Sequence, residues 1–342
     1  MTPVSLLGVA SYLPERVVTN DFFAAGTETR KGMFTAPRTR RHVAPGESAA
    51  DMIVKAATRL CRERGLDPAR DVDALFTNVS VPDQAFTGCG AEVAHRLGAK
   101  PRFVVDLHNG GCVAFIYMME LVQALVGSGG VRGALLCNVQ NAAGRVFAQE
   151  GVRDRSQAPV PGDGAGVGWV AASDASPILS VVHEIHGEFS RDMDAAGDDG
   201  RRYWEPGQSP ITIRFTEERV ASIIERGNRL VPDLVLRACK DAGVAVRDVD
   251  LLVTNQPNSI FVRNWHEALE LPPERHHDTF AEYGNLFGAA LPVNLDDAIR
   301  RGKLRPGMLL ALGGFAHAGD YAAAAIVRWG GEVAANERHR DG

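Results

Sequence analysis

Two stretches of the chain repeat one pattern of apolar and polar positions. Residues 59–78 (RLCRERGLDPARDVDALFTN) and 237–255 (RACKDAGVAVRDVDLLVTN) each carry apolar residues at helical spacing, then a glycine, then a short apolar run. This order predicts an amphipathic helix, a glycine stop and a buried strand, which together make half of a βαβ unit. Asn78 and Asn255 end the two copies at equivalent positions.

A second repeated pair follows in the same order. GDGAGVGWVAAS (162–173) resembles GDYAAAAIVRWG (319–330), and in both a Gly-Asp turn leads into an apolar strand. Two ordered pairs, separated by about half the chain, indicate an internal duplication. Because strands alternate with helices, we expect an α/β protein of two pseudo-symmetric halves with parallel sheets. Ligands should then bind at strand ends near the junction of the halves.

The composition argues against several classes of function. The chain has 342 residues, 45% of them hydrophobic, and a net charge of −5, which argues against nucleic-acid or membrane-surface partners. Its five cysteines form no CxxC pair and no Cys/His metal spacing, so we expect reduced thiols and no metal. The N-terminus does not resemble a signal peptide, and no apolar run approaches the length of a membrane span. These features predict a cytoplasmic protein.

Cys112 is a candidate nucleophile. The sequence FVVD (103–106) predicts a buried strand and HNGG predicts a turn. CVAFIYMMELVQALV predicts a long, almost wholly apolar and therefore central helix that begins at this cysteine. A thiol at a helix N-terminus has a stabilised thiolate, which lowers its pKa and suits covalent thioester chemistry. The alternative is a small buried cysteine at the start of a core helix.

At this point the chain resembles a known family. The duplicated halves, NGGCVAF, GDGAGVGWV, NQPN and EYGNLFGAALPVNL resemble a type III ketosynthase of the thiolase superfamily, over nearly the whole chain. The resemblance implies a homodimer of five-layered αβαβα subunits with no permanently bound cofactor. It also implies that Cys112 receives an acyl group from acyl-CoA or an acyl carrier protein. The predicted divisions are an N-terminal half (1–174), a loop or insert (175–215), a C-terminal half (216–330) and a flexible tail (331–342).

The resemblance implies a catalytic set of Cys, His and Asn, of which one member is missing. Asn285 stands in the family's Gly-Asn motif, here EYGN. The family's histidine opens a motif that reads NQPN in this chain, so Asn255 replaces it, while Asn258 keeps the position that helps to hold the pantetheine arm. An amide carries no charge and exchanges no proton near pH 7. We therefore expect decarboxylative condensation to be impaired, but not acylation of Cys112.

The segment GGFAHAG offers a replacement base. The resemblance assigns a backbone N–H of Gly314 to the oxyanion hole, with the N–H of Cys112 as the second donor. His317 follows, and Asp320 lies three residues beyond it. This spacing suits a histidine and carboxylate pair that acts as general base for an alcohol or amine. The alternative is that Asp320 caps a turn and His317 faces solvent.

Two further segments bear on the substrates. The resemblance implies that Phe34 stacks on the adenine of coenzyme A and that Arg38 lies beside its phosphates. Residues 187–214 are polar and rich in Gly, Asp and Arg, which indicates a long surface loop that shapes an acceptor site. Tyr203 and Trp204 in this loop either form a platform for a sugar or polycyclic ring, or anchor the loop.

Three functions remain open from the sequence. The main hypothesis is an acyltransferase that resembles the ketosynthase-like acyltransferases of polyketide pathways. It would pass an acyl group, such as an intact malonyl, from Cys112 to a hydroxyl or amine of a small-molecule acceptor such as a glycosylated polyketide. The alternatives are a starter-unit β-ketoacyl synthase III, in which His317 acts in place of the usual histidine, and a non-catalytic partner subunit of a ketosynthase.

Overall fold

Two five-stranded sheets with matching strand order lie within residues 2–25, 32–84, 86–108, 110–197, 199–214 and 217–332, the part of the chain that the computed structural model describes. The first sheet has the order β1 (Val4–Tyr12), β7 (Gly164–Ala172), β6 (Gly133–Gln140), β4 (Ala74–Val79), β5 (Phe103–Asp106). The second has the order β8 (Ile178–Ile185), β14 (Tyr321–Arg328), β13 (Leu309–Ala316), β11 (Leu251–Thr254), β12 (His276–His277). Each strand of one sheet therefore has an equivalent in the other.

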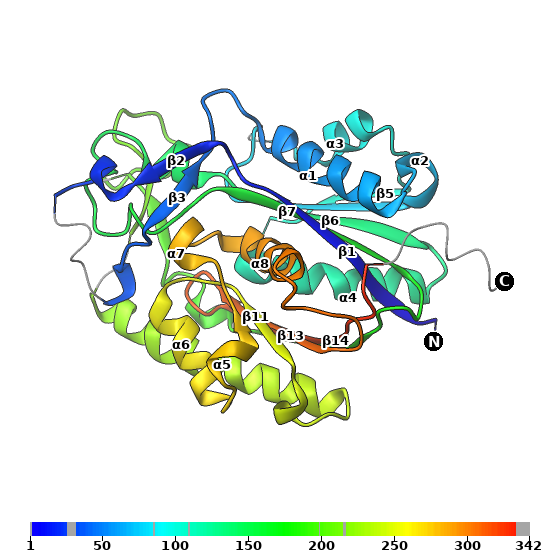
Figure 1. Cartoon of the computed structure of the whole chain (residues 1–342). Coiled ribbons are helices and arrows are strands. Elements are labelled where there is room, and N and C mark those ends of the chain that lie inside the picture. The colour runs from blue at the N-terminus through cyan, green and yellow to red at the C-terminus, as the bar shows by residue number, and fades with distance from the viewer. Residues whose placement is uncertain are drawn as a thin grey trace.

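The helices form three layers around these sheets (Figure 1). The first sheet is covered outside by α1 (Ala49–Arg64) and α3 (Gly90–Leu97), and the second by α5 (Glu217–Asp241), with α6 (Ser259–Ala268) packed on α5. Between the sheets lie α4 (Ala114–Gly127) and α8 (Ala290–Arg300), which contact strands of both. Two short helices, α2 (Pro68–Asp71) and α7 (Phe280–Tyr283), connect larger elements. The result is the expected five-layered αβαβα arrangement.

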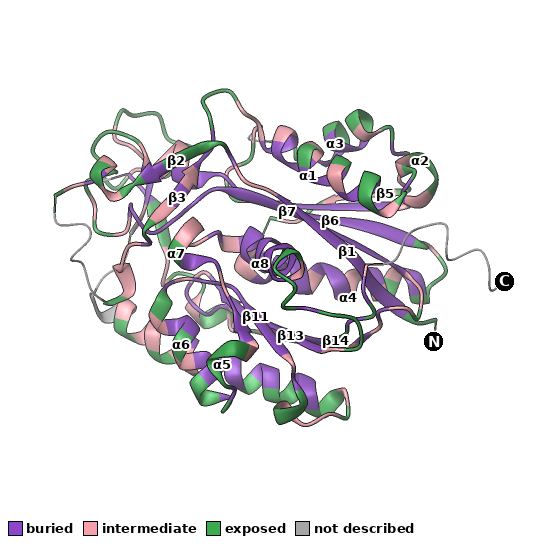
Figure 2. Cartoon of the chain, in the orientation of Figure 1, coloured by how far each residue is buried: buried purple, intermediate pink, exposed green. Residues whose placement is uncertain are grey.

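Burial follows these layers. Figure 2 shows the sheets and the central helices mostly buried, whereas the outer helices expose one side. The apolar sequence of α4 suits its central place, because residues such as Phe115, Met118 and Met119 are fully buried. Gly65 and Gly243, the glycine stops of the two repeated phrases, have φ angles of +63° and +69°. Both end their helices in the left-handed conformation that glycine adopts readily.

The duplication predicted from the repeated phrases is confirmed, but the expected parallel sheets are wrong in part. Strand β4 runs parallel to β5 and β6, and β11 runs parallel to β12 and β13. In contrast, β7 and β14 run antiparallel to both of their neighbours. Only four residues, 317–320, join β13 to β14, and a connection this short can join only antiparallel strands.

Two local expectations also change. The FVVD segment, predicted as a buried strand, is the half-exposed edge strand β5. Strand β8 belongs to the second sheet although it lies inside the predicted insert 175–215; the rest of that segment forms a small sheet of β9 (Asp194–Ala196) and β10 (Thr212–Arg214). Most of the predicted tail, residues 333–342, lies outside the described residues.

The described helices include none that combines the length and the apolar character needed to cross a bilayer.

Two more strands, β2 (Arg16–Thr19) and β3 (Thr39–His42), pair as a separate ribbon beside the first sheet. This ribbon and the β9–β10 sheet are the additions to the duplicated framework.

Candidate active site

Cys112 lies in a tight turn between strand β5 and helix α4. A 3₁₀ turn, Gly111–Val113, precedes the helix, and Gly111 has a φ of +47°, in the left-handed region that favours glycine. A Cβ added at Gly110 would lie 2.7 Å from the Cβ of Ala114, which leaves no room for a side chain. The geometry of the nucleophile turn therefore requires both of the glycines that the sequence places there.

The thiol of Cys112 is not pre-ionised. Burial raises the pKa of this thiol to about 12, although hydrogen bonds with the Asn255 side chain and the His317 backbone act in the opposite direction. The prediction of a lowered pKa is therefore wrong, because loss of hydration outweighs the helix N-terminus. A thiol of this kind needs a base to take its proton when it attacks a thioester.

Asn255 follows strand β11 directly and is fully buried beside Cys112. Its Nδ2 donates to Phe315 O at 2.9 Å, and its backbone N–H donates to Gly313 O at 3.1 Å. Both carbonyls belong to the neighbouring strand β13. Asn255, which the resemblance places where the family has a histidine, is thus held by two contacts with the backbone of one neighbouring strand.

Backbone hydrogen bonds from Cys112 itself and from His317 are among the causes that lower the pKa of the Cys112 thiol, against the larger effect of burial. Gly314, predicted to be the second oxyanion donor, lies inside β13, where a Cβ would stand 2.8 Å from Asn255 Oδ1. Its lack of a side chain makes room for Asn255. Both Gly314, as the resemblance implies, and His317 are therefore candidates for the second oxyanion donor.

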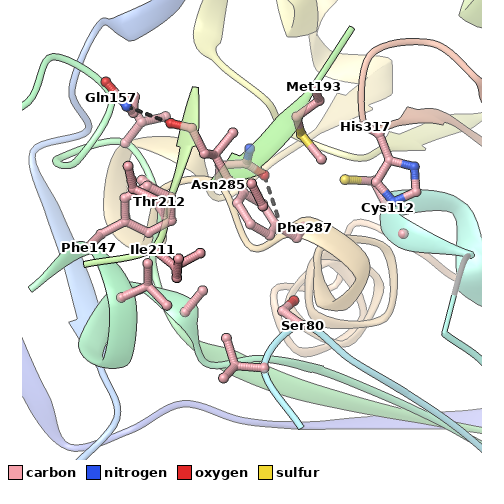
Figure 3. A pocket seen from close by; sticks show the side chains of 18 of the residues that line it. Ser80, Cys112, Phe147, Gln157, Met193, Ile211, Thr212, Asn285, Phe287 and His317 are labelled. Atoms are coloured by element: carbon pink, nitrogen blue, oxygen red, sulfur yellow. Dashed lines mark hydrogen bonds between the residues drawn. The ribbon is translucent and has the colours of Figure 1, made fainter. Parts of the chain in front are cut away.

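The imidazole of His317 lies over the nucleophile turn. A Cβ added at Gly111 would be 2.8 Å from His317 Nε2, while Nδ1 lies 3.0 Å from Oδ1 of the buried Asp320. Figure 3 shows His317 and Cys112 next to each other at one side of a pocket. The spacing of three residues thus brings an imidazole and a carboxylate together beside the thiol, in place of the alternative in which His317 points to solvent.

His317 adopts an unusual backbone conformation. Its φ of +49° falls in the left-handed region, which few residues other than glycine occupy. Such conformations persist only where the surrounding structure enforces them, and they concentrate at functional sites. The strain at this position agrees with a role that depends on the direction of the imidazole.

Asn285 lies on the far side of the nucleophile from His317 (Figure 3). Its Oδ1 accepts from Phe287 N at 3.0 Å, and its backbone N–H donates to Val160 O at 2.9 Å. With Oδ1 fixed in this way, Nδ2 is the group of Asn285 that is left to donate into the pocket. The expected Asn of the catalytic set is therefore present in an orientation that can bind a carbonyl oxygen.

These residues border a chamber of about 1030 Å³. Its walls are mainly apolar and include Phe147, Met193, Ile211 and Phe287, which Figure 3 shows around the open space beyond Cys112. Pockets for drug-sized ligands have volumes of roughly 300 to 1,000 Å³. The chamber therefore has room for a ligand far larger than an acetyl group.

The residues predicted to hold the acyl carrier are partly brought together. Phe34 is half-buried and lines the chamber, as does its neighbour Met33. Asn258 is buried, caps helix α6 by accepting from Ile260 N and Phe261 N, and donates to Met33 O at 3.4 Å. Arg38 is exposed and does not line the chamber. Asn258 thus shapes the chamber wall from behind Met33.

The polar loop predicted to shape an acceptor site contributes to the chamber through Met193, Ile211 and Tyr203, among others. Tyr203 and Trp204 pack edge to face at 5.0 Å and remain 69% and 60% exposed. Rings this exposed contribute little to anchoring a loop. The interpretation of the pair as a platform next to the chamber is the one that their exposure favours.

Sequence reasoning missed the residues that hold the His317 loop in place. Arg226 on α5 donates from Nε and Nη2 to Ala318 O, at 3.1 and 2.9 Å. This contact joins residues 92 positions apart, and Arg226 occurs in an ordinary amphipathic helix pattern, so the sequence carries no local signal for it.

Comparison with known proteins identifies the family of this chain. Residues 105–187 match the family described as 3-oxoacyl-[acyl-carrier-protein] synthase III, and residues 239–329 match its C-terminal domain. The β-ketoacyl-[acyl-carrier-protein] synthase III of Granulibacter bethesdensis is 31% identical over 324 residues, which cover 90% of this chain and 95% of the relative. The chain belongs to the 3-oxoacyl-[acyl-carrier-protein] synthase III family. Synthase III 1 of Halalkalibacterium halodurans is 27% identical, with 96% of this chain and all of the relative covered.

Solved structures of this synthase III family have the same fold. The enzyme from Thermus thermophilus matches with a TM-score of 0.82 at 28% identity, over 96% of this chain and 99% of that one. The priming β-ketosynthase of the R1128 polyketide pathway also matches with a TM-score of 0.82, at 26% identity over 95% and 96% of the chains. The resemblance to a type III ketosynthase and the thiolase-like fold are thus confirmed, and the protein is an enzyme of this family.

The raised thiol pKa gives a first testable result. We expect the rate of Cys112 alkylation by iodoacetamide to rise about tenfold per pH unit from pH 7 to pH 10 without a plateau, because the thiolate fraction grows in this way below the thiol pKa. Intact-protein mass spectrometry measures the rate, and Cys112→Ala identifies the site. The other four cysteines are buried. A plateau below pH 8 would instead indicate a stable thiolate–imidazolium pair with His317.

Proposed function

We propose that this synthase III homologue is an acyltransferase that moves an acyl group from acyl-CoA, or from an acyl carrier protein, through Cys112 to a hydroxyl or amine of a small-molecule acceptor. The observation that carries the proposal is the pairing of His317 with Asp320 over the nucleophile turn, while an amide occupies position 255. A base beside the nucleophile suits an acceptor that must lose a proton. An amide at position 255 carries no charge and exchanges no proton near pH 7, so it stabilises an enolate less well than the histidine that the resemblance implies at this position.

The first half-reaction acylates the enzyme. Asp320 accepts from Nδ1–H of His317, which leaves the lone pair on Nε2. Nε2 takes the proton of the Cys112 thiol as the sulfur attacks the thioester carbonyl. The backbone amide of Cys112, together with that of Gly314 or His317, stabilises the oxyanion. The carbon–sulfur bond to the carrier then breaks, and the leaving thiolate takes the proton from the imidazolium.

The second half-reaction releases the product. Nε2 of His317 takes the proton of the acceptor hydroxyl or amine, and the acceptor atom attacks the acyl carbon on Cys112. The bond between this carbon and the sulfur breaks, and the imidazolium returns its proton to the Cys112 thiolate. No carbon dioxide is lost in either step. The two half-reactions make a ping-pong mechanism.

A second candidate function is decarboxylative condensation with a malonyl carrier, and the names of the relatives favour it. Several are called β-ketoacyl-[acyl-carrier-protein] synthase III, and one structural neighbour is a priming ketosynthase. Asn285, which the condensing reaction uses, is also present. Asn255 argues against decarboxylative condensation, because its Nδ2 already donates to Phe315 O and its amide cannot exchange a proton near pH 7.

Mass spectrometry of the intact protein with malonyl-CoA separates these functions. We expect a stable adduct with the full malonyl mass on the wild type and none on Cys112→Ala. An acetyl-sized adduct, together with release of carbon dioxide, would support condensation. The third hypothesis, a non-catalytic subunit, would be supported by two results together. No acyl-CoA or acyl carrier protein would give an adduct, and the pathway would make as much product with Cys112→Ala as with the wild type. Light scattering tests the expected homodimer.

A further inference from the structure

Arg226 connects two segments that border the nucleophile. From helix α5, its Nε and Nη2 donate to Ala318 O, and Nη2 also lies 2.6 Å from Asp192 Oδ2. The guanidinium carbon lies 3.9 Å from the ring centre of Phe189. The arginine and aspartate side chains are 12% and 24% exposed, so the ion pair is shielded from water. Such a pair is more strongly held than one on an open surface.

The contact of Arg226 with Ala318 O holds the loop that carries His317. Ala318 is the residue that directly follows His317, and Gly319 beyond it has a φ of +95°. The loop thus contains two left-handed residues on either side of the carbonyl that Arg226 binds with two N–H groups. A bidentate contact fixes both the position and the direction of that carbonyl. It therefore opposes relaxation of His317 toward an ordinary backbone conformation.

The contact of Arg226 with Asp192 holds a segment that forms part of the chamber wall. Asp192 immediately precedes Met193, and Figure 3 shows Met193 above the same side of the chamber as His317 and Cys112. Because Arg226 binds both segments, it helps to hold the distance between the base and this wall. The two segments are more than a hundred positions apart in the chain but are also joined by backbone, since His186 N donates to Asp320 O at 2.7 Å. Arg226 adds a side-chain contact to this backbone contact.

We propose that Arg226 is a positioning residue for acyl transfer. Its contact with Ala318 O aims the imidazole of His317 at the nucleophile, and its contact with Asp192 places Met193 against the bound acceptor. Arg226 touches neither the acyl group nor the acceptor and acts through these two segments. The inference rests on the proposed role of His317 as base.

The two contacts predict two different kinetic effects. Arg226→Gln loses the bidentate contact and the charge, so kcat for transfer to an alcohol should fall about tenfold to a hundredfold, as misplacement of a catalytic group does. Asp192→Asn keeps the contact with Ala318 O, so it should raise the acceptor KM several-fold and change kcat less than threefold. Arg229→Gln is the matched control, since this arginine lies on the same helix with a 63% exposed side chain.

A double-mutant cycle tests whether Arg226 acts through His317. Single-turnover transfer from acylated Cys112 to n-butanol is measured for His317→Asn, Arg226→Gln and the double variant. In the His317→Asn background, Arg226→Gln should change the rate less than threefold. Equal losses in both backgrounds, or no loss in the wild-type background, would overturn the inference. An unchanged rate in His317→Asn alone would instead refute the base assignment in the proposed function.

Discussion

Replacing His317 by asparagine should lower the rate of acyl transfer to an alcohol acceptor by about 10²- to 10⁴-fold, the usual contribution of a general base. Asparagine tolerates the left-handed backbone of this position better than most residues, so the loop should keep its shape. The measurement is single-turnover transfer from acylated Cys112 to n-butanol, followed by the loss of adduct mass. Acylation itself should also slow, because the thiol pKa near 12 leaves little thiolate at neutral pH.

A companion variant separates the base from a structural effect. Asp320→Asn keeps a hydrogen-bonding group next to Nδ1 but removes the carboxylate that stabilises the imidazolium, so it should show a smaller loss in the same direction. Thermal unfolding of both variants should match the wild type within a few degrees. If His317→Asn transfers acyl groups within threefold of the wild-type rate, another group supplies the base and the proposed mechanism is wrong.

Much of the fold could be predicted because its signals are local. The glycine stops at Gly65 and Gly243, and the apolar runs after them, depend on a few neighbouring residues and recur in both halves. Their repetition revealed the duplication before any contact was known. The direction of β14 could also have been inferred, since four residues are too few for the crossover that a parallel strand needs.

Less of the candidate site could be predicted from the sequence, because its properties depend on contacts between residues that are far apart in the chain. The helix start at Cys112 predicts a low thiol pKa, but burial of the sulfur in the folded chain raises it more than the contacts with Asn255 and His317, from the other half of the chain, lower it. The desolvation that raises the pKa is thus a tertiary effect. The contacts of Arg226 are also a tertiary effect, since its partners lie 34 and 92 positions away in the sequence. In contrast, His317 and Asp320 were found because three residues separate them.

Restoring the family's histidine at position 255 should give the second large effect. In Asn255→His we expect the release of carbon dioxide from a malonyl thioester to rise about 10²- to 10³-fold, the scale of one well-placed oxyanion donor. The histidine would stand at the end of β11 beside the sulfur, with Asn285 as the second donor to the enolate. Loss of the malonyl adduct from Cys112, with formation of an acetyl-sized product, is read by mass spectrometry beside the measured carbon dioxide.

The matched control for this variant is Asn255→Asp, which has nearly the same shape but offers no N–H donor, so it should not increase decarboxylation. Transfer of intact malonyl to an alcohol should fall in Asn255→His, because the acyl group is consumed before the acceptor attacks. If the wild type already releases carbon dioxide as fast as Asn255→His, then position 255 does not decide the reaction. His317 would in that case serve condensation, and the decarboxylative function suggested by the relatives would replace the acyl transfer proposed for this chain.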